Sequence, residues 1–147
     1  MDKVYIISRY AAKTRKERHF NEEVARYFCR KIMREGKRPV APHLFYPQFC
    51  DDSNQKERQA GLKFAIKDLD ECDSFLLVII DGIISEGMRG EIEHISRVGG
   101  RHGHIVAMSR KEAEILIEGG ETDDATRNEH RPGGRLSSGI FQLHKKA

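Results

Sequence analysis

The 147-residue sequence has no tryptophan, only three cysteines and no long apolar run. The cysteines, at positions 29, 50 and 72, are odd in number and form no Cys-x-x-Cys pair. This pattern argues against a disulfide framework or a zinc site and favours a reducing compartment, so we expect a cytoplasmic protein. No stretch approaches the roughly 18 apolar residues of a membrane span, and residues 1–20 lack the apolar segment of a signal peptide. We therefore expect no membrane partner.

A large excess of one charge is also missing. The chain has 26 Lys and Arg against 23 Asp and Glu, a net charge of +3, and both signs are mixed over most of its length. Nucleic-acid binding is therefore not predicted. The His, Asp and Glu residues do not recur at metal-ligand spacing, so we expect neither a metal nor another cofactor.

Apolar segments alternate with amphipathic ones along most of the chain. Strands are expected at 3–8, 38–45, 74–80 and 104–109, and helices at 21–35, 56–72, 87–98 and 111–119. The helix at 21–35 would be capped by Asn21, and the charged residues before it would form a solvated loop. This alternation predicts an α/β fold, a Rossmann-like or flavodoxin-like three-layer sandwich with a parallel sheet of four to five strands.

The composition changes near Gly119. The following residues are rich in Gly, Asp, Arg and Ser and contain few apolar side chains. We therefore expect one domain over residues 1–118 and a flexible polar tail over 119–147. Within that tail, residues 140–146 could dock on a neighbour.

In open parallel sheets, ligands bind beyond the carboxyl ends of the strands. Three segments are expected to meet there in one crevice: Ser8 to Tyr10 after the first strand, His43 after the second, and 81–91 after the third. The helix beginning near Gly87 would point its amino end at that crevice, where free N–H groups and the helix dipole favour a phosphate or carboxylate.

Single side chains around this helix end suggest more specific roles. Ser85 can add a hydroxyl and Arg9 a charge-assisted contact, while Gly87 and Gly90 would let a ligand approach closely. Glu91 is expected in the first turn of the helix, ionised and partly desolvated, where it could attack an anomeric carbon. The simpler interpretation is that a first-turn glutamate complements the helix dipole.

Four segments together resemble a known family: "VYIIS" at 4–8, "APHLFYPQF" at 41–49, "CDSFLLV" at 72–78 and "SEGMRGEI" at 85–92. They are similar to the nucleoside 2-deoxyribosyltransferase superfamily, in particular its small phage- and bacteria-associated branch, over roughly residues 3–108. The resemblance implies that Glu91 is the nucleophile and that Ser85 holds the phosphate of a deoxynucleoside 5′-monophosphate. It also implies that Ser8, Arg9 and Tyr10 line the sugar-phosphate site and that the protein is a homodimer or higher homo-oligomer.

The sequence departs from the family at one place. The family often has an aspartate about two helical turns before the pair at 72–73, where this chain has Ala65. Asp68, Asp70 or Asp81 could substitute for it.

Two functions are therefore expected. The first is an N-glycosidase or deoxyribosyltransferase in which Glu91 attacks C1′ of a nucleoside or deoxynucleoside 5′-monophosphate and Asp81 assists the leaving base. The second is a protein that binds a nucleotide or an ADP-ribose-like signal without cleaving it. The expected substrate-binding residues are Ser8, Arg9, Tyr10, His43, Ser85, Gly87 and Met88.

Overall fold

The computed structural model of the chain describes residues 2–119 and 137–143. Its strands are β1 (Lys3–Ile7), β2 (Arg38–Val40), β3 (Ser74–Ile80), β4 (Arg101–Met108) and β5 (Ser137–Leu143). Its helices are α1 (Arg15–Arg34), α2 (Pro42–Phe45), the 3₁₀ helix η1 (Tyr46–Gln48), α3 (Gln55–Asp70), α4 (Glu86–Val98) and α5 (Arg110–Glu118). None of the helices in this part of the chain has the length and apolar character needed to cross a bilayer.

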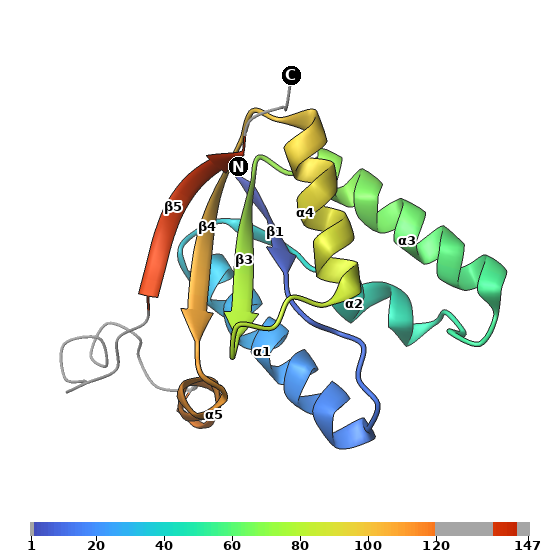
Figure 1. The fold of residues 1–147 in the computed structure, drawn as a ribbon, viewed down its shortest axis with the longest axis horizontal. Helices are drawn as coiled ribbons and strands as arrows, with labels where there is room; N and C mark the ends of the chain where they lie inside the picture. The colour runs from blue at the N-terminus through green and yellow to red at the C-terminus, as the bar shows by residue number, and fades with distance from the viewer. Residues whose placement is uncertain (1, 120–136, 144–147) are drawn as a thin grey trace.

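The strands form one sheet in the order β2-β1-β3-β4-β5 (Figure 1). The first four strands are parallel, and β5 runs antiparallel to β4. Apolar residues of α1 and α5 pack against one face of the sheet, and those of α3 and α4 pack against the other. This arrangement confirms the predicted α/β sandwich of the Rossmann-like or flavodoxin-like type.

The two faces of β1 belong to different layers of the core. Val4 and Ile6 point toward α1 and α5, whereas Tyr5 and Ile7 point toward α3 and α4. Alternate residues of a strand point to opposite faces of a sheet, so this division continues past the strand end. The face toward which each residue points therefore decides which candidate residues can contact one another.

Helix α1 is longer at its amino end than the sequence predicts. It begins at Arg15, where the Thr14 hydroxyl caps it by accepting a 3.1 Å hydrogen bond from the Glu17 N–H. The charged run at 15–18 is therefore the first turn of the helix and not a loop. Asn21, expected as the cap, lies inside the helix and is buried.

The second predicted strand is also different. Only Arg38–Val40 pairs with β1, and α2 follows at once with Pro42 at its amino end. Proline suits this position because its missing N–H would be unpaired there in any case. The prediction of extended structure through residue 45 was wrong.

Part of the predicted polar tail is a strand. Residues 137–143 pair with β4 in a register that places His104 opposite Ile140. Ile140 and Phe141 favour extended structure, and the open edge of β4 supplies the partner. The remaining tail, 120–136 and 144–147, lies outside the described residues, as does the end of the segment predicted to dock on a neighbour.

Candidate functional site

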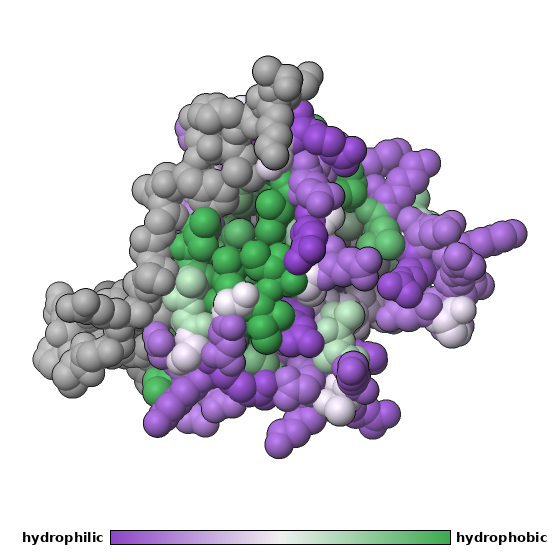
Figure 2. All heavy atoms as spheres, viewed as in Figure 1, coloured by the Kyte–Doolittle hydropathy of each residue, from purple (hydrophilic) through white to green (hydrophobic). Residues whose placement is uncertain are grey.

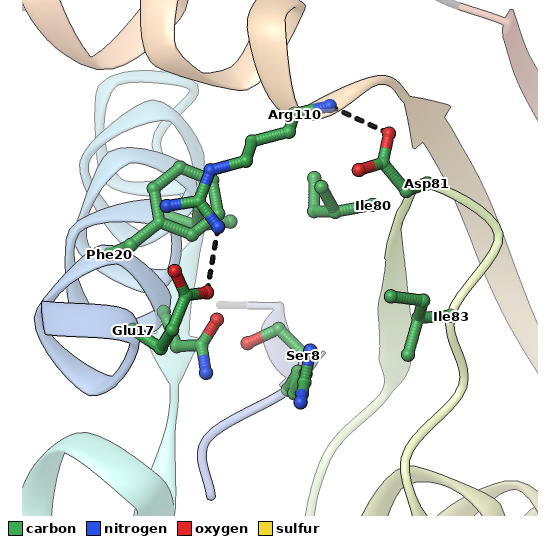
Figure 3. Close-up of a pocket in the computed structure, with 10 residues that line it drawn as sticks. Ser8, Glu17, Phe20, Ile80, Asp81, Ile83 and Arg110 are labelled. Atoms are coloured by element: carbon green, nitrogen blue, oxygen red, sulfur yellow. Dashed lines mark hydrogen bonds and ion pairs between the residues drawn. The ribbon is translucent and has the colours of Figure 1, made fainter. Parts of the chain in front are cut away.

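The candidate residues lie on both sides of the sheet. Ser8, Arg9 and Asp81 line a pocket that also contains residues of α1 and α5 (Figure 3). Glu91 is absent from the described lining of that pocket and instead contacts Tyr5, in the layer of α3 and α4. This pocket therefore holds only some of the residues expected in one crevice, because the side chains of β1 and the segment after it point to opposite faces of the sheet.

Helix α4 brings Glu91 to the sheet. The helix begins at Glu86, and the Ser85 hydroxyl caps it by accepting a 3.3 Å hydrogen bond from the Met88 N–H. Glu91 is therefore in the second turn and not in the first as predicted, so the helix dipole is a weak reason for its presence. It is three residues after Met88 and four before Ile95, both buried, and this spacing places it on the buried face of the helix.

The Glu91 carboxyl is buried with incomplete hydrogen bonding. Its Oε2 atom has no hydrogen-bond partner among the residues that the structure describes. Burial raises the pKa of Glu91 to about 7, and the hydrogen bond from the Tyr5 hydroxyl lowers this pKa only in part. The carboxyl is therefore partly protonated at neutral pH, which differs from the predicted fully ionised group. A buried acceptor without a partner costs about 1–3 kcal/mol, so the arrangement calls for an explanation.

Tyr5 connects Glu91 to an aspartate on α3. The pKa of Tyr5 is raised by burial, then by the charge of Glu91, and further by the charge of Asp68. Asp68 accepts a 2.9 Å hydrogen bond from the Tyr46 hydroxyl, and burial together with this bond raises the pKa of Tyr46 to about 12. Asp68 follows Ala65 by about one helical turn and lies close enough to Tyr5 for its charge to act there.

The other two aspartates considered in place of Ala65 are engaged elsewhere. Asp70 contacts His94 at 2.7 Å and Arg101 at 3.8 Å. Asp81 lies in the pocket of α1 and α5, where its Oδ1 accepts a 2.9 Å hydrogen bond from the Arg110 backbone N–H. The structure therefore does not bring Asp81 together with Glu91.

Ser8, Tyr10 and His43 do come together, as predicted. The Ser8 hydroxyl and His43 Nε2 are 2.9 Å apart, and the rings of Tyr10 and His43 are 6.3 Å apart. Burial lowers the pKa of His43 to about 4, so this imidazole is neutral at physiological pH. His43 is thus placed to orient Ser8.

The predicted residues of α4 differ in accessibility. Met88 is 1% exposed and packs in the core with Tyr5 and Ile95, which argues against the predicted substrate contact. A side chain at Gly87 or Gly90 would meet no atom within 4 Å. Both glycines therefore face open space, and a ligand could approach there.

Several pocket residues were not foreseen, among them Glu17, Phe20, Asn21 and Arg110. The Arg110 guanidinium lies over the Phe20 ring, 4.1 Å from its centroid, and its Nη1 donates a 2.7 Å hydrogen bond to Glu17. One signal was available: Asn21 precedes Val24 and Phe28 at helical spacing, so a polar amide occupies an apolar stripe. Among the described residues, no group of three or more His, Cys, Asp or Glu side chains could hold a metal ion.

Comparison with known proteins gives one informative result. A family model described as a domain of unknown function, DUF7768, matches residues 2–102, which include Tyr5, Asp68 and Glu91. A search of curated proteins finds no match. Because the matched segment spans well over half of the sequence, the chain belongs to the DUF7768 family of domains of unknown function.

Proposed function

We propose that the protein is an N-glycosidase or deoxyribosyltransferase that acts on nucleosides or deoxynucleoside 5′-monophosphates. The observation that carries the proposal is the Glu91 carboxyl, which is buried, has one oxygen without a partner in the described chain and has a pKa of about 7. Strongly perturbed carboxyl groups with an open hydrogen-bonding position are concentrated at functional sites. The resemblance to the deoxyribosyltransferases assigns the nucleophile to this same residue.

The reaction requires Glu91 in its ionised form. One carboxylate oxygen bonds to C1′ of the sugar, and the bond from C1′ to the base nitrogen breaks. The base leaves with the bonding electrons and takes up a proton. Water, or a second base in a transferase, then attacks C1′, releases the Glu91 carboxylate and gives up a proton. The Tyr5 hydroxyl supports this cycle because its hydrogen bond favours the ionised carboxyl.

We assign to Asp68, in place of Asp81, the transfer of a proton from solvent water to the leaving base. Asp68 acts on the same Tyr5 that contacts Glu91, whereas Asp81 lies on the other side of the sheet. Ser85 supports a phosphate-binding role, because its oxygen caps α4 while its hydroxyl hydrogen can still be donated to an anion.

A homodimer or higher homo-oligomer belongs to the same proposal. Figure 2 shows an apolar area over β3 and β4, beside α4, and Ile83 and Ile84 in the adjoining loop are exposed. A second copy of the chain is the proposed cover, and light scattering after size exclusion tests it: a monomer at micromolar concentration would contradict it.

The alternative is a nucleotide-binding protein without catalysis. The observation that favours it is the pocket lined by Ser8 and Arg9, because a ligand bound there would not contact Glu91.

One experiment separates the two functions. The protein is incubated with dAMP, dGMP, dCMP and dTMP, and free base is measured by chromatography. We expect release of base by the wild type, none by Glu91→Gln, and normal release by Glu93→Gln, whose side chain is exposed on the same helix. Nucleotide binding without release by the wild type would support the alternative, and full activity of Glu91→Gln would exclude the proposed nucleophile.

A further inference from the structure

We propose that the solvent-facing side of α1 is a docking surface for double-stranded DNA, bound through its phosphates and without regard to base sequence. This basic face is defined by the cations that the helix exposes: Arg15, Lys16, Arg26, Arg30 and Arg34. Helix α1 packs on one face of the sheet, whereas Glu91 lies in the layer on the other. The proposal therefore goes beyond the proposed glycosidase activity and does not depend on it.

Charge is divided unevenly along the chain. Residues 13–38 contain ten Lys and Arg against four Asp and Glu, whereas residues 39–119 contain nine against 14. The net charge of +3 averages over this division, so it does not by itself predict nucleic-acid binding. Cations gathered on one helix or one face are a better indicator of polyanion binding than the charge of the whole chain.

The helical period places these cations together. Val24 and Phe28 belong to the buried side of α1, which packs against the sheet. Arg26, Arg30 and Arg34 recur at four-residue spacing on the other side, and all three are exposed. Since a helix rises 1.5 Å per residue, the three guanidinium groups belong to a segment about 12 Å long. A compact row of positive charge therefore faces solvent.

Local interactions explain only part of this row. Arg34 is in the last turn of α1, where a cation complements the helix dipole, but Arg26 and Arg30 come before that turn. Arg26 contacts Glu23 at 3.0 Å, and 54% of its side chain is exposed. An exposed ion pair contributes at most about 1 kcal/mol, so a phosphate can replace the Glu23 carboxylate. Folding thus gains little from these arginines, which favours a role in binding.

The composition of the basic face favours a nucleic acid over a lipid bilayer or an acidic protein. Within Arg15–Arg34, Met33 is the only exposed apolar side chain. A helix that lies in a membrane surface needs an apolar side for the lipid, and α1 has already buried its apolar side in the core. Protein interfaces likewise need an apolar centre, whereas interfaces with DNA are polar and positively charged. Guanidinium groups also suit phosphate oxygens.

Double-stranded DNA fits this face better than single strands or RNA. Single strands bind by stacking their bases on aromatic rings. The Phe20 ring instead lies under the Arg110 guanidinium, and Tyr27 packs against Phe28 with 5.1 Å between ring centroids. Duplex RNA is recognised partly through its 2′-hydroxyl groups. From residue 15 to 38, buried Asn21 is the only Ser, Thr, Asn or Gln. The phosphates of duplex DNA require only cations.

The test measures binding of the full chain to a fluorescent DNA duplex of mixed sequence by anisotropy at several salt concentrations. Binding to phosphates alone predicts a dissociation constant of roughly 1–100 µM near physiological salt. Each neutralised phosphate contributes about −0.9 to the slope of log K against log salt, so the five exposed cations predict a slope of about −4.

Paired substitutions locate the surface. Arg26→Gln/Arg30→Gln should weaken binding by about tenfold or more and make the salt slope shallower by about 2. The matched control, Arg58→Gln/Arg97→Gln, removes two exposed arginines of α3 and α4, on the other face of the sheet. We expect the control to bind like the wild type. Thermal melts check that both variants fold, as substitutions of exposed side chains should allow.

Two further ligands of the same length, a DNA single strand and an RNA duplex, test the choice of partner. Weaker binding of both than of the DNA duplex supports the proposal. It is overturned if the wild type does not bind the DNA duplex at low salt or if its binding does not depend on salt. It is also overturned if Arg26→Gln/Arg30→Gln binds like the wild type, if the control variant loses as much affinity, or if either comparison ligand binds as tightly as the DNA duplex.

Discussion

The carboxyl of Glu91, on α4, faces the hydroxyl of Tyr5, on β1, inside the layer between the sheet and helices α3 and α4. Burial raises the pKa of both groups, and each influences the other: the tyrosine hydroxyl lowers the carboxyl pKa, and the carboxylate raises the phenol pKa. Substitutions of Tyr5 and Glu91 therefore test the proposed chemistry directly.

Stability should depend on pH through Glu91. Its pKa rises from 4.5 to about 7 on folding, so its contribution to stability is full below pH 4.5 and is lost as the pH rises through 7. We expect Glu91→Gln to be more stable than the wild type at pH 8 by on the order of 2–3 kcal/mol, and to lose most of this advantage at pH 5. Urea denaturation at both pH values measures the difference. Glu93→Gln, an exposed control, should show no such change, and an equal Glu91→Gln effect at both pH values would contradict the buried carboxyl.

The pH dependence of turnover should report the Tyr5 contact. A nucleophilic Glu91 must be ionised, so kcat/KM should rise as the pH passes about 7. Tyr5→Phe removes the hydroxyl that lowers the carboxyl pKa, and the rising limb should move to higher pH. We expect a several-fold loss at pH 7 that largely recovers at pH 9. A uniform loss at all pH values would indicate that Tyr5 serves packing alone.

Asp68 should matter for departure of the base. Asp68→Asn removes the carboxylate proposed to transfer a proton from solvent to the base while leaving an acceptor for the Tyr46 hydroxyl, and general acid–base catalysis is commonly worth roughly 10²–10⁴ in rate. We expect a loss of that size in kcat for base release, measured by chromatography of the free base. Glu71→Gln, an exposed carboxylate at the end of the same helix, is the control. Asp68→Asn with wild-type kcat would return the role to another group.

Arg101 should be a structural clamp. Its guanidinium donates 2.6 Å hydrogen bonds to the carbonyls of Leu69 and Asp70, and it also contacts the Cys72 carbonyl. These bonds join the start of β4 to the end of α3, where helix carbonyls lack partners within the helix. Arg101→Ala should lower the free energy of unfolding by about 2–4 kcal/mol, as measured by urea denaturation. Arg97→Ala, on the exposed face of α4, should change it little, and an Arg101→Ala protein as stable as the wild type would argue against the clamp.

Local patterns were sufficient for most of the fold. The apolar runs of β1 and β3 and the amphipathic spacing of α3 and α4 depend on neighbouring residues alone, so these elements follow from the sequence. The wrong predictions concern two segments in which the local sequence signals disagree with one another. The amino end of α1 has charged residues where an apolar stripe was expected, and the second strand ends early because Pro42 starts a helix.

The candidate site was predicted less completely than the fold. Glu91, Ser85 and the Ser8–His43 neighbourhood were selected as candidates from their positions after strands, and the structure gives the surroundings of each. Asp68 could not be singled out from three aspartates, because its selection depends on the contact between α3 and β1. Asn21 was visible as a polar residue in an apolar stripe, but its meaning depends on the pocket around it.

By itself, the sequence determined the order of the four parallel strands and of the helices α1, α3, α4 and α5, because hydrophobic periodicity and capping act over a few residues. Only the tertiary structure decided that Tyr5 and Ser8, three residues apart in the chain, serve opposite sides of the sheet. Odd and even residues of a strand point to different faces of the sheet. The connections between the parallel strands determine which helices cover each face, and therefore which acidic and basic side chains lie next to those residues.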